Sequence, residues 1–294
     1  MISDMLARIL PVELEYPSHC PLCGTDGHDH LYEITPFTVV QCLSCSLGYL
    51  SPRAKEEAIM KLYDNSLYYQ SAGGYGYTDY TFQERGLRKS FRHLLRILEK
   101  SDLTKGSLLE IGCGPGFFLD EAKGSFTYRT GMEMCSDIVL PNVADKIIIG
   151  SLDRLTPADQ YDLIVTISVL EHVYNPVSFI KSLLCNLNRN GKVVIVTPDF
   201  NNIWRRIFRK RWQSFKVPEH VIYFNHKSLN ILARLSGLKL LSVFNLPQFF
   251  PLSLVLSKTF FSENSFSFLP KKMKELLIPI PQTMICGIFS REMP

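Results

Sequence analysis

Two pairs of cysteines stand near the start of the 294-residue sequence: CPLC at Cys20 and Cys23, and CLSC at Cys42 and Cys45. Such cysteines suit a metal clamp, two disulfides or a set of unrelated thiols. The N-terminal residues lack a basic segment followed by an apolar one, so we expect no secretory signal and a cytoplasmic location, where disulfides are disfavoured. Because each CxxC pair offers two thiolates from one tight turn, the spacing predicts a structural Zn²⁺ site.

A second chemical pattern is the glycine-rich stretch LLEIGCGPGFFL. Gly112, Gly114 and Gly116 follow a predicted strand there and open a predicted helix. Glycines at such a turn let the backbone approach a ligand closely and leave helix N–H groups pointing at it. The spacing is GxGxG, which differs from the GxGxxG of phosphate-binding dinucleotide sites. Glu110 precedes the glycines, and an acidic residue at that point suits a ligand with a positively charged amine.

Strands and helices alternate from residue 107 onwards. Strands are predicted for SLLEIGC, YRTGMEM, DKIIIG, YDLIVTIS and GKVVIVTP, with helical segments such as PVSFIKSLLCNLN between them. This alternation predicts an α/β fold with a parallel, doubly wound sheet. The apolar run TMICGIFS at 283–290 is the candidate for a final strand.

Further carboxylates follow the next two strands of this predicted sheet. Glu133 ends the second strand, seventeen residues after Gly116. A carboxylate there can accept hydrogen bonds from both hydroxyls of a ribose. Asp153 follows the third strand and is placed to meet an adenine amine.

With these residues together, the sequence resembles the class I S-adenosylmethionine-dependent methyltransferases over residues 68–290. The phrases VLEHVYNP, VTPDFNN and VPEHVIYFNHKSLNILARLSGLKLLSV are similar to those of a bacterial subgroup that methylates small molecules, often sugars. Members of that subgroup often carry an N-terminal ribbon with two CxxC pairs, ending in a phrase such as GYLSP. The resemblance implies a seven-stranded Rossmann-like sheet whose seventh strand is antiparallel, with S-adenosylmethionine as cofactor.

The resemblance also implies roles for individual residues around the cofactor. Glu110 and the three glycines would hold the methionine portion, Glu133 the ribose and Asp153 the adenine. Ser168 and Leu170 would flank the site at the fourth strand. The tyrosine-rich segment YYQSAGGYGYTDY is either a loop that closes over the cofactor, through Tyr77 and Tyr80, or a packed linker.

The acceptor side needs a base if a hydroxyl is methylated, and histidine titrates near neutral pH. His220, in the phrase PEH, is our candidate base, and Glu219 would orient its ring or bind a sugar hydroxyl. The alternative is that both residues only fasten a loop to the sheet. His172 either faces the path of the methyl group or braces its own loop.

We expect three parts in the chain: a zinc-ribbon domain at 1–50, a helical linker and cofactor-capping segment at 51–106, and a methyltransferase domain at 107–294. Insertions at 200–226 and 247–282 are expected to shape the acceptor pocket. The first contains the basic run RRIFRKRW, and the second combines FFPLSLVLSKTFF with PKKMKELL. Contact of these segments with a membrane surface or lipid-linked acceptor, a hydrophobic lid and a homodimer contact are alternatives.

The expected reaction is methyl transfer to a hydroxyl of a sugar, nucleotide-sugar or glycan or lipid-linked precursor. One rival is a zinc-ribbon RNA methyltransferase, and another is a non-catalytic interaction module. The formal net charge of +4 is mild, so nucleic acid is not the expected partner. The phrase ISVL also stands where base-nitrogen methyltransferases carry an Asn/Asp-Pro-Pro-aromatic phrase.

Overall fold

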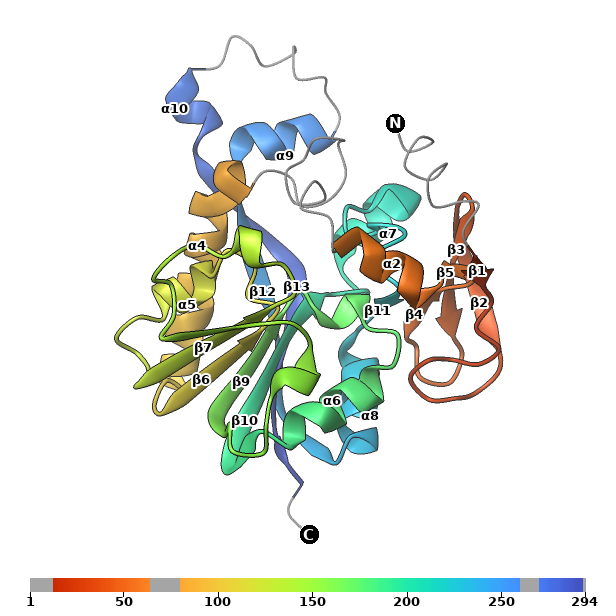
Figure 1. Cartoon of the computed structure of the whole chain (residues 1–294). Helices are drawn as coiled ribbons and strands as arrows, with labels where there is room; N and C mark the ends of the chain where they lie inside the picture. The colour runs from red at the N-terminus through yellow and green to blue at the C-terminus, as the bar shows by residue number, and fades with distance from the viewer. Residues whose placement is uncertain (1–12, 64–79, 260–269, 293–294) are drawn as a thin grey trace.

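A computed structural model of the chain describes residues 13–63, 80–259 and 270–292. It shows a large twisted sheet covered by helices, with a smaller sheet from the N-terminal residues beside it (Figure 1). No helix in these described ranges has both the length and the apolar composition needed to cross a bilayer.

The large sheet has seven strands in the order β12-β13-β10-β9-β6-β7-β8. Neighbouring strands from β10 to β8 run parallel, and β13 is antiparallel to both β10 and β12. The predicted doubly wound sheet with an antiparallel seventh strand is therefore confirmed, and the run at 283–290 lies inside β13. The bounds are β6 (Ser107–Ile111), β7 (Tyr128–Glu133), β8 (Lys146–Ile149), β9 (Tyr161–Ile167), β10 (Leu187–Pro198), β12 (Leu238–Pro251) and β13 (Leu277–Arg291).

Helices cover both faces of this sheet because successive strand residues point to opposite sides. In β9, Leu163 and Val165 share a buried cluster with α4 and α5, whereas Ile164 belongs to the cluster that contains α6 and α8. Burial on both faces explains the unbroken apolar run VVIV in β10. The helices are α4 (Tyr80–Lys100), α5 (Phe117–Glu121), α6 (Pro176–Leu184) and α8 (His226–Leu235).

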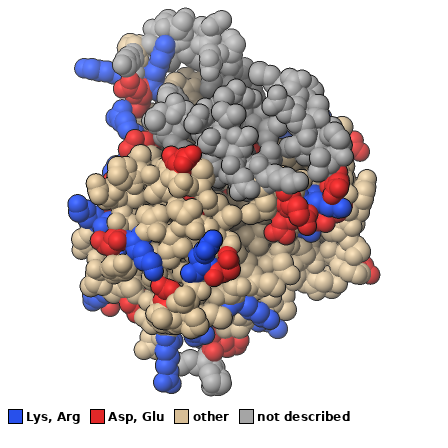
Figure 2. Space-filling model, viewed as in Figure 1, with Lys and Arg blue, Asp and Glu red and all other residues tan. Residues whose placement is uncertain are grey.

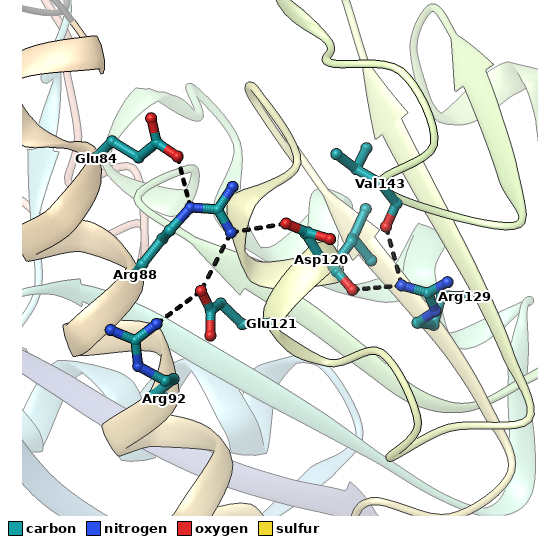
Figure 3. Close-up of polar contacts among 8 residues, drawn as sticks. Glu84, Arg88, Arg92, Asp120, Glu121, Arg129 and Val143 are labelled. Carbon is teal, nitrogen blue, oxygen red and sulfur yellow. Dashed lines mark hydrogen bonds and ion pairs between the residues drawn. The ribbon is translucent and has the colours of Figure 1, made fainter.

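Ion pairs fasten α4 to α5, the short helix that follows the glycine-rich turn (Figure 3). Arg88 of α4 donates to Asp120 at 2.7 Å and to Glu121 at 3.1 Å, and its Nε donates to Glu84 at 2.7 Å. Arg92 also donates to Glu121, at 2.8 Å. The position of α5, and with it the end of the glycine turn, therefore depends on charges from α4.

The small sheet has the strand order β11-β4-β3-β2, and its edge strand comes from the other half of the chain. The bounds are β2 (His28–Ile34), β3 (Phe37–Cys42), β4 (Gly48–Leu50) and β11 (Ile222–Tyr223). Strand β11 pairs antiparallel with β4, with Ile222 opposite Tyr49 and Tyr223 opposite Gly48. The cysteine-bearing ribbon and the segment that contains PEH thus share one sheet.

The two halves also share one hydrophobic core. Phe200, which follows β10, is fully buried, stacks on Tyr223 with ring centroids 5.7 Å apart, and packs against Gly48 of the ribbon. A Cβ at Gly48 would approach the Phe200 ring to 2.5 Å. The ribbon therefore buries its apolar residues against the methyltransferase sheet instead of enclosing a core of its own.

Shorter elements complete the described chain. Strands β12 and β13 continue past the sheet as a paired extension, with Pro251 opposite Leu277. The remaining elements are β1 (Leu14–Glu15) paired with β5 (Arg53–Ala54), α2 (Glu56–Tyr63), α7 (Ile203–Phe208), α9 (Leu252–Thr259), α10 (Lys271–Lys274), and the 3-10 turns η1 (Ser136–Ile138), η2 (Leu152–Arg154), η3 (Leu170–His172) and η4 (Arg209–Arg211).

Candidate active site and metal centre

The glycine turn between β6 and α5 requires glycine for two separate reasons. Gly112 has a φ of 68° and Gly116 a φ of 82°, in the left-handed region that favours glycine. A Cβ at Gly112 would also come within 2.5 Å of Val169, and one at Gly116 within 2.4 Å of Val143. Backbone conformation and close packing therefore both require glycine at positions 112 and 116 of this turn.

Glu110 lies inside β6 and is 3% exposed. Its Oε2 is buried and has no hydrogen-bond partner among the described residues. Burial raises the pKa of this carboxyl well above its ordinary value, and neighbouring Glu133 adds to the increase. A buried carboxyl with an unused oxygen gains most from a cationic partner, so Glu110 fits the ammonium of a methionine portion.

Glu133, at the end of β7, closes against the glycine turn. Its Oε2 accepts a hydrogen bond from the Gly114 N–H at 2.8 Å, and its Oε1 accepts from the Met134 N–H at 2.7 Å. Burial raises the pKa of Glu133, and these backbone hydrogen bonds oppose the rise. The structure thus brings together Glu110, the glycine turn and Glu133, which the sequence placed on separate strands.

The other predicted cofactor residues have different surroundings. Asp153 is exposed in η2, where it accepts a hydrogen bond from the Ser151 hydroxyl that lowers its pKa. Ser168 follows β9 with a φ of 55°, an uncommon conformation for serine, and Leu170 is fully buried in η3. Tyr77 lies outside the described residues, and so does the side chain of Tyr80, the first residue of α4.

Two of the predicted catalytic residues meet in space. The rings of His172 in η3 and His220 lie edge to face, with centroids 4.6 Å apart and an interplanar angle of 84°. The segment that carries His220 is bound to η3, because the Val221 N–H donates to the Glu171 carbonyl at 2.9 Å. Glu219, beside His220, is buried as well.

Burial keeps both imidazoles of this pair neutral. Loss of solvent lowers the pKa of His172 to about 3 and that of His220 well below its ordinary value, and nearby Lys216 acts in the same direction. The His220 Nδ1 lies 2.8 Å from the Ser214 carbonyl oxygen, which only accepts hydrogen bonds, so Nδ1 carries the proton. The lone pair of His220 is therefore on Nε2.

The sequence reasoning missed Glu171, which lies between two residues that it selected. This carboxyl is 1% exposed, and its Oε2 accepts a hydrogen bond from the Thr197 hydroxyl at 2.9 Å. Its Oε1 is buried without a hydrogen-bond partner among the described residues. Burial raises the pKa of Glu171 to about 7. The signal was the phrase LEH itself, in which a charged residue follows an apolar strand immediately before a histidine.

The four ribbon cysteines converge on one point. Cys20 Sγ lies 3.4 Å from Cys45 Sγ, and Cys23 Sγ lies 3.6 Å from Cys42 Sγ. Four sulfurs around Zn²⁺ at about 2.3 Å would be separated by roughly 3.8 Å, so this arrangement has the size of a tetrahedral thiolate site.

The backbone of the two cysteine turns supports the same conclusion. Each pair is followed by a residue in the left-handed region, Gly24 at φ 68° and Ser46 at φ 61°. Each of these residues donates its N–H to the carbonyl of the first cysteine of its pair, at 2.9 Å and 3.0 Å. The two turns therefore present their thiols in the same way, as expected for ligands that bind one ion.

A sheet of this order, with a glycine turn after its first strand and carboxylates at the ends of neighbouring strands, defines a class I S-adenosylmethionine-dependent methyltransferase. The chain belongs to the methyltransferase-domain family, whose model matches residues 82–243.

Named relatives agree with this class. The chain is 30% identical, over 121 residues, to a ubiquinone biosynthesis O-methyltransferase of Glaesserella parasuis serovar 5, and the match covers 35% of this chain and 51% of that protein. The chain thus spans about half the length of this curated relative.

Solved structures give a similar comparison. The magnesium protoporphyrin IX methyltransferase of Synechocystis PCC 6803, with bound SAH, shares the fold at a TM-score of 0.51 and 12% identity, over 80% of this chain and 99% of that one. An S-adenosylmethionine-dependent methyltransferase of Clostridium acetobutylicum has a TM-score of 0.45 and 8% identity, over 80% and 98%.

Proposed function

We propose that this methyltransferase acts on a hydroxyl of a small molecule of the sugar, nucleotide-sugar or glycan-precursor class. The observation that carries the proposal is the buried cluster of Glu171, His172 and His220 beside the end of β9. The relative named as an O-methyltransferase supports transfer to oxygen.

S-adenosylmethionine supplies an electrophilic methyl group bound to a sulfonium. The acceptor oxygen forms a bond to this carbon while the carbon–sulfur bond breaks, S-adenosylhomocysteine leaves, and the hydroxyl proton must be taken up. In this proposal Glu110 binds the ammonium, the glycine turn approaches the methionine portion, Glu133 binds the ribose and Asp153 binds the adenine amine. The main task of these groups is alignment, which supplies much of the rate of an in-line displacement.

The hydroxyl must lose its proton, and the sequence assigns this step to His220. The neutral imidazole has its lone pair on Nε2, but its lowered pKa makes it a weak base. We therefore propose that the cluster as a whole, with Glu219 beside it, prepares the acceptor oxygen.

The cysteine cluster is proposed to hold Zn²⁺ in a purely structural role. Four thiolates fill a tetrahedral ion, so no coordination position is left for chemistry. The ion would stabilise the ribbon, and β4 of the ribbon pairs with β11, the strand that follows the phrase PEH. A cytoplasmic location, contact with a membrane surface and formation of a homodimer stay predictions of the sequence.

The charge distribution favours a small acceptor over RNA. On the face shown in Figure 2, basic side chains alternate with acidic ones instead of forming a continuous basic surface. Arg205, from the basic run at 205–211, lies over the Phe200 ring at 4.2 Å and hydrogen-bonds Tyr32 at 3.3 Å. Part of that run is therefore used to join the ribbon to the sheet.

The test has two stages. Calorimetry with S-adenosylmethionine and S-adenosylhomocysteine should show binding to the purified chain, and absence of binding would refute the cofactor assignment. A panel of nucleotide-sugars, glycans and RNA is then incubated with methyl-labelled cofactor and analysed by mass spectrometry. Label on an oxygen of a small acceptor supports the proposal, and label on RNA alone contradicts it.

A further inference from the structure

We infer that Glu171, His172 and His220 form a binding site for one divalent metal ion, separate from the four-cysteine cluster. Each residue offers one ligand atom, and the three atoms lie within 4.8 Å of one another. Binding of the ion is a property of these residues alone, whereas its use in catalysis rests on the proposed function.

The donor set suits a first-row ion. Two imidazoles and one carboxylate are typical ligands of Mn²⁺, Fe²⁺, Co²⁺ and Zn²⁺, and three protein ligands leave positions open for a substrate. Ligand atoms at about 2.1 Å from one ion stand roughly 3 Å apart.

Each of these three side chains has a hydrogen bond to a neighbouring group, as the ligands of metal sites usually do. His220 donates from Nδ1 to the Ser214 carbonyl at 2.8 Å, which leaves the lone pair of the ring on Nε2 as the donor to an ion. His172 has a hydrogen bond to the backbone of Glu219. Glu171 accepts from the Thr197 hydroxyl at 2.9 Å, and the Ser168 side chain also hydrogen-bonds this carboxyl. Hydrogen bonds of this kind, from the atom that does not bind the ion, orient metal ligands.

The free oxygen of Glu171 is the observation that points to a ligand. This Oε1 is buried, without a hydrogen-bond partner among the described residues, on a side chain that is 1% exposed. A buried carboxylate oxygen without a partner is costly, and a cation removes that cost. Lys216 is the nearby protein cation, since its charge acts on all three residues. The experiment below therefore tests Lys216 as the alternative to a metal ion.

A bound ion would solve the problem of the weak base. Coordination of a hydroxyl oxygen to a divalent cation lowers the pKa of that hydroxyl by several units. The acceptor could then lose its proton near neutral pH even though the pKa of His220 is low. An ion with open positions also selects acceptors that offer two adjacent oxygens, such as the vicinal diol of a sugar.

The test titrates Mn²⁺ alone into the full-length chain loaded with one equivalent of Zn²⁺, followed by electron paramagnetic resonance and calorimetry. We expect one Mn²⁺ to bind per chain, with the four thiolates already occupied. Glu171→Gln should lower the Mn²⁺ affinity at least tenfold, the usual effect of changes at metal sites. The matched control His226→Gln, at an exposed histidine outside the cluster, should leave the affinity unchanged.

Three outcomes would overturn the inference: no Mn²⁺ binding, binding unaffected by Glu171→Gln, or binding that arises only in Lys216→Met. The last result would identify the lysine as the resident cation. Calorimetry with S-adenosylmethionine on the same samples separates the two proposals. If the wild-type chain binds the cofactor but not Mn²⁺, only the ion site is refuted. If the wild-type chain does not bind the cofactor, the proposed function is refuted.

Discussion

The side chain of Asn225 donates a hydrogen bond to the Ser46 carbonyl at 2.6 Å, across 179 positions of sequence. Ser46 follows the last cysteine of the ribbon, and Asn225 caps α8 by accepting from the Ser228 N–H at 3.0 Å. One amide side chain thus joins a cysteine turn to the helix that begins after the phrase PEH. A structural change at the cysteine site should therefore alter the position of the segment that carries His220.

Disabling the proposed zinc site of the ribbon should loosen the segment around β11 while the proposed cofactor site stays intact. We expect the double variant Cys42→Ser, Cys45→Ser to raise hydrogen exchange at residues 218–224 at least tenfold, because β4 loses its support. Affinity for S-adenosylmethionine should change less than threefold. Cys185→Ser, at an exposed cysteine outside the cluster, is the control. Unchanged protection of β11 would show that the ribbon holds its shape without metal.

Adding one methyl group at Gly116 should damage the cofactor turn, and the chain contains a matched control for this change. Gly116→Ala and Gly124→Ala place alanine at nearly equal φ values, 82° and 83°. Both therefore incur about 1–2 kcal/mol of backbone strain. At Gly116 the new Cβ also meets Val143 at 2.4 Å, whereas at Gly124 nothing lies within 4 Å.

We expect a further loss of about 1–3 kcal/mol for Gly116→Ala, with at least tenfold weaker cofactor binding. Denaturant unfolding and calorimetry measure the two effects. Equal losses of unfolding free energy in both variants would mean that Val143 moves away from the new Cβ at no energetic cost.

Replacing Glu110 by glutamine should stabilise the ligand-free protein and weaken its binding of S-adenosylmethionine. The folded pKa of Glu110 lies above its unfolded value of about 4.5. At pH 4 the carboxyl is largely protonated in both states, so the change costs little. As pH rises, the unfolded chain ionises first, and wild-type stability falls until the folded pKa is passed.

The free-energy difference between Glu110→Gln and wild type should therefore grow from pH 4 to pH 7, by at most about 1.4 kcal/mol for each unit by which the folded pKa exceeds the unfolded one. Unfolding in urea across this range provides the measurement. A difference that does not depend on pH would contradict the raised pKa. Cofactor affinity in the variant should fall at least tenfold, because the ammonium loses its partner.

Removing the ion pairs of Arg88 should make α5 less firmly held and thereby weaken cofactor binding, although Arg88 itself is not a proposed cofactor residue. The Arg88 side chain is 19% exposed and pairs with three carboxylates, so Arg88→Ala leaves Asp120 and Glu121 without that partner. We expect a loss of about 1–3 kcal/mol in unfolding free energy. Arg85→Ala, one turn away at 70% exposure, should change it by less than about 0.5 kcal/mol. Equal effects of the two changes would rule out an anchoring role for Arg88.

Local patterns were sufficient to predict the sheet, and they also placed the proposed cofactor residues at one edge of it. Glu110 is the penultimate residue of β6 and Glu133 is the last residue of β7, and the parallel pairing of these two strands brings them to the same edge of the sheet. The four cysteines needed only their spacing, because each pair is one local turn. In these cases the signal lies within about ten residues of the functional group.

The cluster of Glu171, His172 and His220 could not be predicted in the same way. Strand β11 is two residues long, too short for any periodicity, and it forms because β4 offers an open edge. The phrase LEH marks Glu171 locally, but its proximity to His220, which comes from another segment, is not visible in that phrase. These contacts depend on tertiary packing, which a pattern within one segment does not encode.

The shared sheet also constrains how this protein is made. Strand β4 leaves the ribosome long before β11, so a nascent ribbon carries an unpaired edge until the second half of the chain has been synthesised. Premature pairing of that edge with another chain would compete with correct assembly. For the same reason the ribbon and the catalytic half are poor units for domain exchange, since a ribbon from a different enzyme would have to supply a matching edge for Ile222 and Tyr223.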